Sequence, residues 1–379
     1  MPSDGAKLKS LALKLGLVET SRNNEDIQSI KIENCIGFSK VPVGLAGPVH
    51  IVGPDVNGTL YAPLATCEPT LVASCSRGCK AFNRSGGLRF DILGDGMSRA
   101  PVFAFQDPGR AVAFYRSVPA FQAEFAAWAK TTSRFVQLTE MRPAIIGSNV
   151  HLFCHYTCGD ASGQNMVTKA TSYACSQLRK KYADKFAMTD FYLEGQLASD
   201  KKPSWGNVNA ARGVQVLAWG KITSASCKEV LGLTMERLYD LYKVGQDGGL
   251  RNGLFGSNIN TANIIAAMYI STGQDAGSVA ESSWSHLTME FDKSDEGLIV
   301  SLFFPSLTVG TVGGGTAYST QRETLRALGC LGSNKKNALA GIIASFALAL
   351  DVSTLAAIAN DTFTDAHMRL ARGENYGKL

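Results

Sequence analysis

The sequence lacks several patterns that would assign a protein to a class at once. Its nine cysteines show no CxxC spacing, so we interpret them as reduced core thiols in a cytosol-like compartment. The longest apolar run, residues 338–350, covers 13 positions and is shorter than the roughly 20 that a membrane span needs. No GxGxxG fingerprint occurs, which argues against the ordinary dinucleotide-binding fold. The sequence therefore predicts neither a membrane anchor nor a metal site.

Charge is also sparse and dispersed. Charged residues make up 18% of the 379 positions and the net charge is +5, too mild for nucleic acid but suited to a polyanionic small ligand such as a nucleotide. The length and the 45% hydrophobic content allow two or three globular domains with a large core. Residues 377–379 resemble a peroxisomal tripeptide except for glycine in place of serine. We predict a cytoplasmic protein, with the peroxisome as the alternative.

Periodicity and turn residues predict a mixed α+β fold. A helical arm is expected over residues 1–32, and short strands over 101–105 and 150–156. An aromatic-rich helix is expected over 109–130, and apolar residues at a period of 3.6 predict a helix over 166–178.

Two glycine-rich turns could hold a phosphate. Residues 159–166 join a strand to a helix and leave free backbone N–H groups at the helix start. Residues 311–316 could bring bare backbone close to a ligand. By themselves, these turns indicate an anion site without identifying its ligand.

Two short segments carry candidate reactive groups. Lys201 and Lys202 follow Asp200 and form a dense positive site that could polarise a carbonyl or hold a carboxylate, although adjacent lysines more often lie on a solvated surface. Glu68 stands just outside a helix that Pro69 is expected to begin, where a carboxylate could serve as a cap.

Taken together, these segments resemble the catalytic domain of hydroxymethylglutaryl-CoA reductase of the eukaryotic-type class. The matching motifs occur in family order over nearly the whole chain. They are ENxIG and PVGxAGP (33–48), LATxE to RGCKA (64–81), DGMxRxPV (95–102), TSRF (132–135), GDAxGxN (159–165), DKKP (200–203), TGQD (272–275), GTVGGGT (310–316) and AHM (366–368).

The resemblance implies a domain organisation and an assembly. A large domain that binds the CoA substrate is expected over 33–91 and 204–379, with a ferredoxin-like NADPH-binding domain inserted over 92–193. Residues 194–203 form the connecting loop that bears the two lysines. The family's active site lies at a subunit interface, so a homodimer or homotetramer is implied.

The resemblance also implies four catalytic residues for two successive hydride transfers from thioester to alcohol. Glu68 corresponds to the proton donor for the carbonyl oxygen, and Lys201 to the cation that stabilises negative charge on that oxygen. Asp275 is expected to link the glutamate to the lysine. His367 is expected to protonate the departing CoA thiolate, since histidine titrates near neutral pH.

NADPH is the cofactor that the resemblance implies. Arg134 is expected to bind its 2′-phosphate, and the 159–166 turn to lie beneath the nicotinamide half. The implied cofactor-binding residues are Ser133, Arg134, Phe135, Asp160, Gly163, Asn165, Gly313 and Gly314.

The substrate side departs from the family pattern. Asp91 stands where an arginine for the substrate carboxylate is expected, and Glu194 stands where a serine is expected, so both add negative charge that would weaken binding of an acidic substrate. Asn260 replaces a histidine, and Gln164 a methionine. The implied substrate-side residues are Asp200, Lys202, Lys243, Asn263, Asp91, Glu194 and Asn260.

Three functions remain open from the sequence. The first is an NADPH-dependent reductase of an acyl-CoA, most simply of hydroxymethylglutaryl-CoA to mevalonate. The second is a diverged enzyme of specialised metabolism that acts on a substrate without the distal carboxylate. The third is a non-catalytic ligand-binding homologue, which the retained acid and lysine residues disfavour, because a buried charge cluster is costly to keep.

Overall fold

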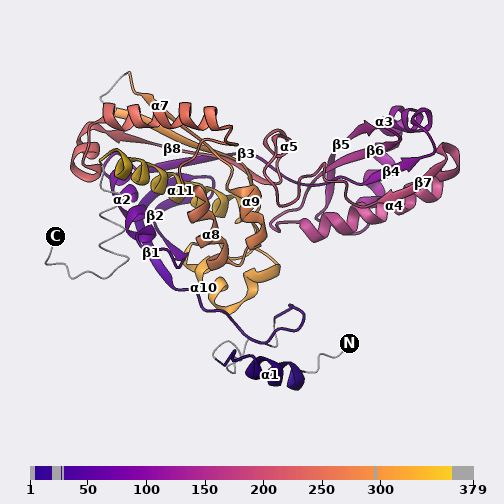
Figure 1. Ribbon diagram of the computed structural model, residues 1–379, viewed down its shortest axis with the longest axis horizontal. Coiled ribbons are helices and arrows are strands. Elements are labelled where there is room, and N and C mark those ends of the chain that lie inside the picture. The colour runs from indigo at the N-terminus through magenta and orange to yellow at the C-terminus, as the bar shows by residue number, and fades with distance from the viewer. Residues whose placement is uncertain (1–4, 19–26, 28–29, 294–296, 361–379) are drawn as a thin grey trace.

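The structure is a computed structural model that describes residues 5–18, 27, 30–293 and 297–360. Figure 1 shows a larger body and a smaller one, joined through the long strand β3 (Leu88–Arg99). The helix α1 (Gly5–Lys14) lies at the edge of the larger body, which confirms a helix in the N-terminal arm.

The larger body surrounds one central helix, α11 (Lys336–Ala359). Its strands are β1 (Val43–Gly53), β2 (Val56–Ala65), β8 (Gly213–Thr223), β9 (His286–Phe291) and β10 (Gly297–Leu307). Its other helices and helical turns are α2 (Leu71–Asn83), α5 (Trp205–Asn209), α6 (Ser224–Ser226), η2 (Cys227–Leu231), α7 (Met235–Asn252), α8 (Thr261–Thr272), η3 (Ala276–Ser278), α9 (Val279–Ser282), η4 (Gly314–Ala317) and α10 (Ser319–Ala327).

The smaller body has the ferredoxin-like order of elements. Its chain order is β4 (Val102–Phe105), α3 (Pro108–Lys130), β5 (Gln137–Ile146), β6 (Asn149–Thr157), α4 (Gln164–Phe186) and β7 (Met188–Tyr192). The strands pair antiparallel in the spatial order β7-β4-β6-β5, as a βαββαβ unit requires. The expected strands β4 and β6 and the helices α3 and α4 are confirmed.

Strand β3 belongs to both bodies. Its residues Leu88 to Gly96 pair with β8 of the larger body, and Met97 to Arg99 pair with β6 of the smaller one. A Cβ atom at Gly96 would lie 2.0 Å from the His155 ring, so only glycine fits at the crossover. The strand pairing thus changes between 96 and 97, a few residues after the domain boundary expected at 92. The sequence does not show this point because one strand pattern serves both sheets.

The two bodies have separate hydrophobic cores. In the larger one, α2 crosses α11 so closely that a Cβ atom at Gly78 would lie 1.8 Å from the Ala349 carbonyl oxygen. Helix α11 is the one described helix long and apolar enough to pass for a membrane span, but 94% of that stretch is buried inside the protein. Its apolar sequence is therefore explained by its place in the core.

Asp351, on α11, makes stability depend on pH. Its side chain is fully buried and accepts hydrogen bonds from the backbone N–H groups of Ile259 and Asn260, and burial raises the pKa of its carboxyl to about 7. Between about pH 4 and 7 the unfolded chain loses a proton that the folded chain keeps, so the free energy of unfolding should fall by about 1.4 kcal/mol per pH unit.

Asp351→Asn removes this titration. We therefore expect urea unfolding at pH 5, 6 and 7 to show a shallower decline of stability in the variant than in the parent protein. The amide replaces one accepting oxygen by a donor, so the variant should also be less stable than the parent at pH 5. Parallel pH profiles for the two proteins would contradict the assignment.

Candidate active site

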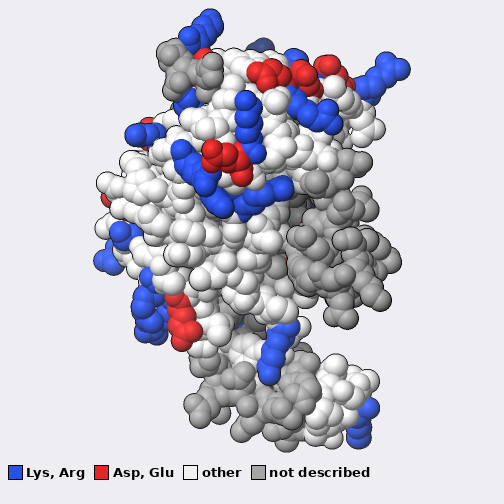
Figure 2. Space-filling view, turned by 90° about the vertical axis from the view of Figure 1, so that its left-hand side faces the viewer, with Lys and Arg blue, Asp and Glu red and all other residues white. Residues whose placement is uncertain are grey.

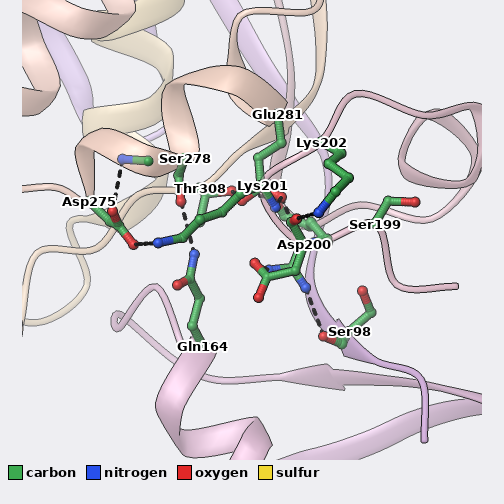
Figure 3. Close-up of polar contacts among 12 residues, drawn as sticks. Ser98, Gln164, Ser199, Asp200, Lys201, Lys202, Asp275, Ser278, Glu281 and Thr308 are labelled. Carbon is green, nitrogen blue, oxygen red and sulfur yellow. Dashed lines mark hydrogen bonds and ion pairs between the residues drawn. The ribbon is translucent and has the colours of Figure 1, made fainter. Parts of the chain in front are cut away.

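Lys201 and Asp275 form an ion pair at the junction of the two bodies. The Lys201 ammonium lies 2.8 Å from the Asp275 carboxylate, and both side chains are a little under half exposed (Figure 3). Asp275 also accepts a hydrogen bond from the Gly277 N–H at 2.9 Å, which fixes its carboxylate. The hydrogen bond to Asp275 raises the pKa of Lys201, so this side chain remains a cation at neutral pH.

Buried and partly buried charged side chains hold the loop that carries Lys201. The Lys201 backbone N–H donates to the Glu281 carboxylate at 3.0 Å. Asp200 bridges two arginines, with one oxygen 2.8 Å from Arg99 and the other 2.6 Å from Arg212. The adjacent lysines are therefore part of a fixed structure rather than a freely solvated surface pair.

Glu68 lies between β2 and α2, and its partner is on another helix. Its Oε1 atom accepts a hydrogen bond of 3.1 Å from the amide of Asn263, in the first turn of α8. The expected capping role is wrong: α2 begins at Leu71, and Thr70 occupies the N-cap position with φ +73° and no side-chain cap. The helix also begins two residues later than the position expected for Pro69.

Within one chain, helix α8 separates Glu68 from the Lys201–Asp275 ion pair. Asn263, the partner of Glu68, is in the first turn of α8, and Asp275 follows its last turn. From Asn263 to Thr272 the helix rises about 14 Å. Among the described residues no hydrogen bond or ion pair joins Glu68 to Lys201 or Asp275. The expected link from Asp275 to the glutamate is therefore not formed in a single chain, although its link to the lysine is.

A basic cavity lies along α2. The cavity has a volume of about 610 Å³ and is lined by Arg77 and Lys80 of α2, by Arg84 just after that helix, by Gly47 and Pro48 of β1 and by Glu229. Arg84 forms an ion pair with Glu229. Figure 2 shows basic side chains gathered around an acidic one on this end of the larger body. The sequence analysis missed this site, although cations recurring every three to four residues on one helix were its signal.

The two glycine-rich turns lie against each other. Asp160 accepts hydrogen bonds from the Lys335 and Lys336 N–H groups through its side chain and from the Thr311 N–H through its carbonyl. A Cβ atom at Gly310 would lie 2.5 Å from the Ser162 nitrogen. The structure thus brings together two segments 150 residues apart, and it uses the Asp160 carboxylate at the start of α11 rather than leaving it free.

Comparison with known proteins identifies the family. The family model for hydroxymethylglutaryl-coenzyme A reductase matches residues 6–372. The 3-hydroxy-3-methylglutaryl-coenzyme A reductase of Haloferax volcanii is 38% identical over 347 residues, covering 90% of this chain and 85% of the relative. That of Aeropyrum pernix is 38% identical over 377 residues, covering 97% and 87%. The chain belongs to the hydroxymethylglutaryl-coenzyme A reductase family.

The fold agrees with this family. The class II 3-hydroxy-3-methylglutaryl-CoA reductase of Streptococcus pneumoniae, solved with NADPH in open conformations, superimposes with a TM-score of 0.69 at 20% identity, covering 94% of this chain and 97% of that one. The expected α+β fold of hydroxymethylglutaryl-CoA reductases is therefore confirmed. The eukaryotic-type class remains a prediction.

The residues expected at the reductase's cofactor site fit a dinucleotide phosphate. The Arg134 guanidinium lies 4.7 Å from the centre of the Phe135 ring, and both side chains are exposed. Gly313 and Gly314 have positive φ angles, and no atom lies within 4 Å of the positions their Cβ atoms would take, so their backbone is open to a ligand. An exposed cation and a bare glycine turn are the groups that a phosphorylated nucleotide needs.

Other expected cofactor residues have structural contacts. The Ser133 hydroxyl lies 3.5 Å from the Met166 sulfur. Gly163 has φ +87° and is the N-cap residue of α4, while Asn165 is exposed in the first turn of that helix. Gln164, which stands where the family has methionine, donates a hydrogen bond of 2.9 Å to Ser278 near Asp275 (Figure 3). It thereby ties the smaller body to the segment that carries Asp275.

The residues that differ from the family pattern on the substrate side have hydrogen-bond partners within this chain. Glu194 accepts hydrogen bonds from the Ala100 and Gln196 N–H groups and lies 3.7 Å from Arg99, so its charge is compensated. Its expected place on the substrate side stays a prediction.

Asn260 is held by residues of α11. Its amide nitrogen donates to the Thr354 hydroxyl at 3.0 Å, and its backbone N–H donates to Asp351. Its buried Oδ1 atom has no partner among the described residues. Asn260 thus joins α8 to α11.

Asp91 is exposed on β3 and accepts a hydrogen bond from the Ile92 N–H. About 20 Å of strand separates it from Ser98, beside the Lys201 loop. Lys202 donates to the Asp200 carbonyl at 3.2 Å, and Lys243 is exposed on α7. His367 lies outside the described residues. Within the described part of the chain no group of three His, Cys, Asp or Glu side chains could hold a metal ion.

Proposed function

We propose that this chain reduces hydroxymethylglutaryl-CoA to mevalonate with NADPH and releases CoA. The observation that carries the proposal is the Lys201–Asp275 ion pair, at 2.8 Å, beside the glycine-rich turns of the cofactor side. Family membership of almost the whole chain supports the reaction, and the cavity along α2 supports a CoA thioester as the substrate.

Lys201 is the electrophilic group in this mechanism. A carbonyl oxygen that gains negative charge during hydride transfer is stabilised by a preorganised cation. Asp275 and the loop below hold the ammonium in place before the substrate binds, so no reorganisation is required during the reaction. The same group can serve both reduction steps, since each converts a carbonyl oxygen into an alkoxide.

Glu68 supplies the proton. The Asn263 amide donates to Oε1, so Oε2 is the oxygen left to face a substrate. Asn263 therefore orients the acid. His367 retains the role that the resemblance implies, protonation of the CoA thiolate.

NADPH supplies the hydride when it is bound. Arg134 would hold its 2′-phosphate through charge-assisted hydrogen bonds, and the Gly313–Gly314 backbone would approach the rest of the molecule. Gln164, bonded to Ser278, holds the smaller body against the segment that carries Asp275. The chain's own task is thus to place the cofactor side next to Lys201.

The complete site requires two chains. Because α8 separates Glu68 from Lys201 in one chain, Glu68 and Asn263 of one protomer would meet Lys201 and Asp275 of a second copy. Exposed apolar side chains flank both halves: Leu45 on the hairpin leading to Glu68 is 59% exposed, and Trp205, just after the lysine loop, is 65% exposed. A homodimer, or a tetramer built from such dimers, would cover these side chains.

The α2 cavity would bind the phosphate groups of CoA. Lys80 lies about two and a half turns along α2, which begins three residues after Glu68, so a phosphate at Lys80 leaves room for an extended arm that reaches the acid. Lys80→Ala should raise the KM for the thioester about 10-fold and leave kcat unchanged, because this contact is equal in the ground and transition states. The effect should shrink at high salt. Lys180→Ala, an exposed lysine of α4, is the matched control. An unchanged KM in the Lys80 variant would place CoA elsewhere.

The direct test is consumption of NADPH with hydroxymethylglutaryl-CoA beside a panel of neutral acyl-CoA thioesters. We expect oxidation with hydroxymethylglutaryl-CoA and formation of mevalonate. Because Asp91 leaves one exposed carboxylate where the family has arginine, a diverged substrate is the second candidate. Oxidation with a neutral thioester alone would establish that candidate, and no oxidation with any thioester would refute reduction altogether.

A further inference from the structure

Arg212 is a fully buried cation in the larger body. Its three nitrogen atoms bond Glu281 at 2.8 Å, Asp200 at 2.6 Å and the Ser98 carbonyl at 2.8 Å. Taking a guanidinium out of water costs several kcal/mol, and an apolar side chain of the same volume would often serve stability as well. A fully buried pair, Arg212 and Glu281, therefore calls for a reason other than packing.

Arg212 and Lys201 are connected through Glu281, which bonds the Lys201 backbone. Glu281 is 1% exposed, and its Oε2 atom accepts both the Arg212 Nε–H and the Lys201 backbone N–H, the latter at 3.0 Å (Figure 3). Its Oε1 atom accepts from the Thr308 hydroxyl at 2.9 Å. Every described contact of this carboxylate thus holds it in one position beneath the lysine loop.

The loop needs such support because its backbone is strained. Lys201 has φ +57° and Ser199 has φ +52°, left-handed values that cost non-glycine residues about 1 kcal/mol or more each. A conformation of this kind persists only where its surroundings over-determine it. The bond from Glu281 to the Lys201 N–H is a contact that selects it directly.

Glu281 and Asp275 lie on one short segment, formed by η3 and α9. Asp275 holds the ammonium end of Lys201, and Glu281 holds its backbone. Because the two carboxylates are six positions apart on one helical segment, Lys201 is held at its ammonium and at its backbone by the same part of the chain. Movement of either end would change where the ammonium meets a carbonyl.

We propose that Glu281, seated on the buried Arg212, is a positioning residue that sets the place and orientation of Lys201 for carbonyl reduction. The proposal rests on the function proposed above, in which Lys201 stabilises the developing oxyanion. The alternative is that Arg212 and Glu281 only stabilise the fold. The two explanations predict different results for Glu281 variants that still fold: only a positioning role predicts a change in kcat and in the titration of Lys201.

Two substitutions separate the position of Glu281 from its charge. Glu281→Asp keeps the charge but withdraws the carboxylate by about 1.5 Å, which should break the bond to the Lys201 N–H and lower kcat about 10²-fold, with KM values within about threefold of the parent. Glu281→Gln keeps an accepting oxygen but removes the charge. Its kcat should fall less, and the alkaline limb of its pH profile should move to lower pH.

The direction of that shift follows from the groups around Lys201. The carboxylates of Asp275, Asp200 and Glu281 face it and raise its pKa, while Arg212, Arg99 and Lys202 are the nearby cations. Removing the Glu281 charge therefore lowers the pKa of Lys201. NMR titration of ¹³C-labelled lysine side chains, assigned with Lys201→Ala, measures this change without any turnover. If the parent proves inactive with hydroxymethylglutaryl-CoA, the proposed function fails, but this titration still decides the role of Glu281.

Ser282→Ala is the matched control, because Ser282 is the adjacent buried residue of α9 and bonds Tyr269 and the Thr308 N–H instead of the lysine loop. It should lose stability and keep the parent's kcat and pH profile. If the Glu281 variants do not fold, Arg212→Lys, which cannot bond Glu281, Asp200 and Ser98 together, carries the same expectation for kcat.

A double-mutant cycle completes the test. In a Lys201→Ala background, Glu281→Asp should cost the residual activity nothing further, since it acts through the lysine. Parent-like kcat and lysine titration in both Glu281 variants, or an equal loss in the presence and absence of Lys201, would overturn the proposal and leave Glu281 a purely structural residue.

Discussion

Replacing Lys201 by alanine should lower kcat about 10³-fold while NADPH and the thioester still bind. The ammonium meets Asp275 at 2.8 Å and the Lys201 side chain is 45% exposed, so a substrate oxygen can approach it, and its loss removes the principal stabilisation of the alkoxide and little of the binding energy. Steady-state NADPH oxidation gives kcat and KM, and equilibrium dialysis gives the affinity for the cofactor.

Lys202→Ala is the matched comparison. It removes the adjacent ammonium, which bonds the Asp200 carbonyl, and leaves the Lys201–Asp275 pair in place. Its kcat should remain within about 10-fold of the parent. Equal losses in the two variants would show that the loop contributes only general positive charge, and the assignment of Lys201 as the electrophilic group would be wrong.

Two inactive variants should restore activity to each other when they share a dimer. Glu68→Gln and Lys201→Ala each damage one half of a site that two chains complete. In a mixed dimer one site receives the intact Glu68 of one chain and the intact Lys201 of the other. Because one of the two sites in each mixed dimer is intact, the purified mixed dimer should show about half of the parent activity per dimer.

Co-expression of the two variants with different affinity tags, followed by NADPH oxidation assays on the doubly tagged species, measures this recovery. A pairing of Glu68→Gln with Asn263→Ala is the control, since both residues belong to the same half and no mixed site is intact. A site assembled within one chain would give no recovery in either pairing, and that result would contradict the proposed dimer.

Local sequence was sufficient for much of the secondary structure. The 3.6-residue period predicted α4, the aromatic-rich segment predicted α3, and the apolar runs predicted β4 and β6, because each of these elements follows from the pattern of its own residues. The start of α2 was misplaced because Pro69 satisfies the rule for a first helical residue, whereas a left-handed Thr70 sets the boundary.

The sequence could predict contacts between residues that lie in recognisable motifs. DKKP and TGQD predicted that Lys201 and Asp275 would meet, and the structure places them in contact. Arg212 and Glu281 were missed, because an arginine after two alanines and a glutamate in a four-residue helix carry no local signal of burial or pairing. Glu194 was expected to repel a substrate because its partner, Arg99, is 95 positions away in the chain.

The sequence by itself determined which chemical groups are available: a lysine pair, acids in two motifs, two glycine turns and an apolar segment long enough to form a buried core helix. Only the tertiary structure decided which of these groups face one another. Glu68 and Lys201 lie near opposite ends of helix α8. Glu281, bonded to Arg212, holds the backbone of Lys201. The physical reason is that side-chain identity and periodicity are local, whereas electrostatic pairing depends on distances that arise when remote segments pack together.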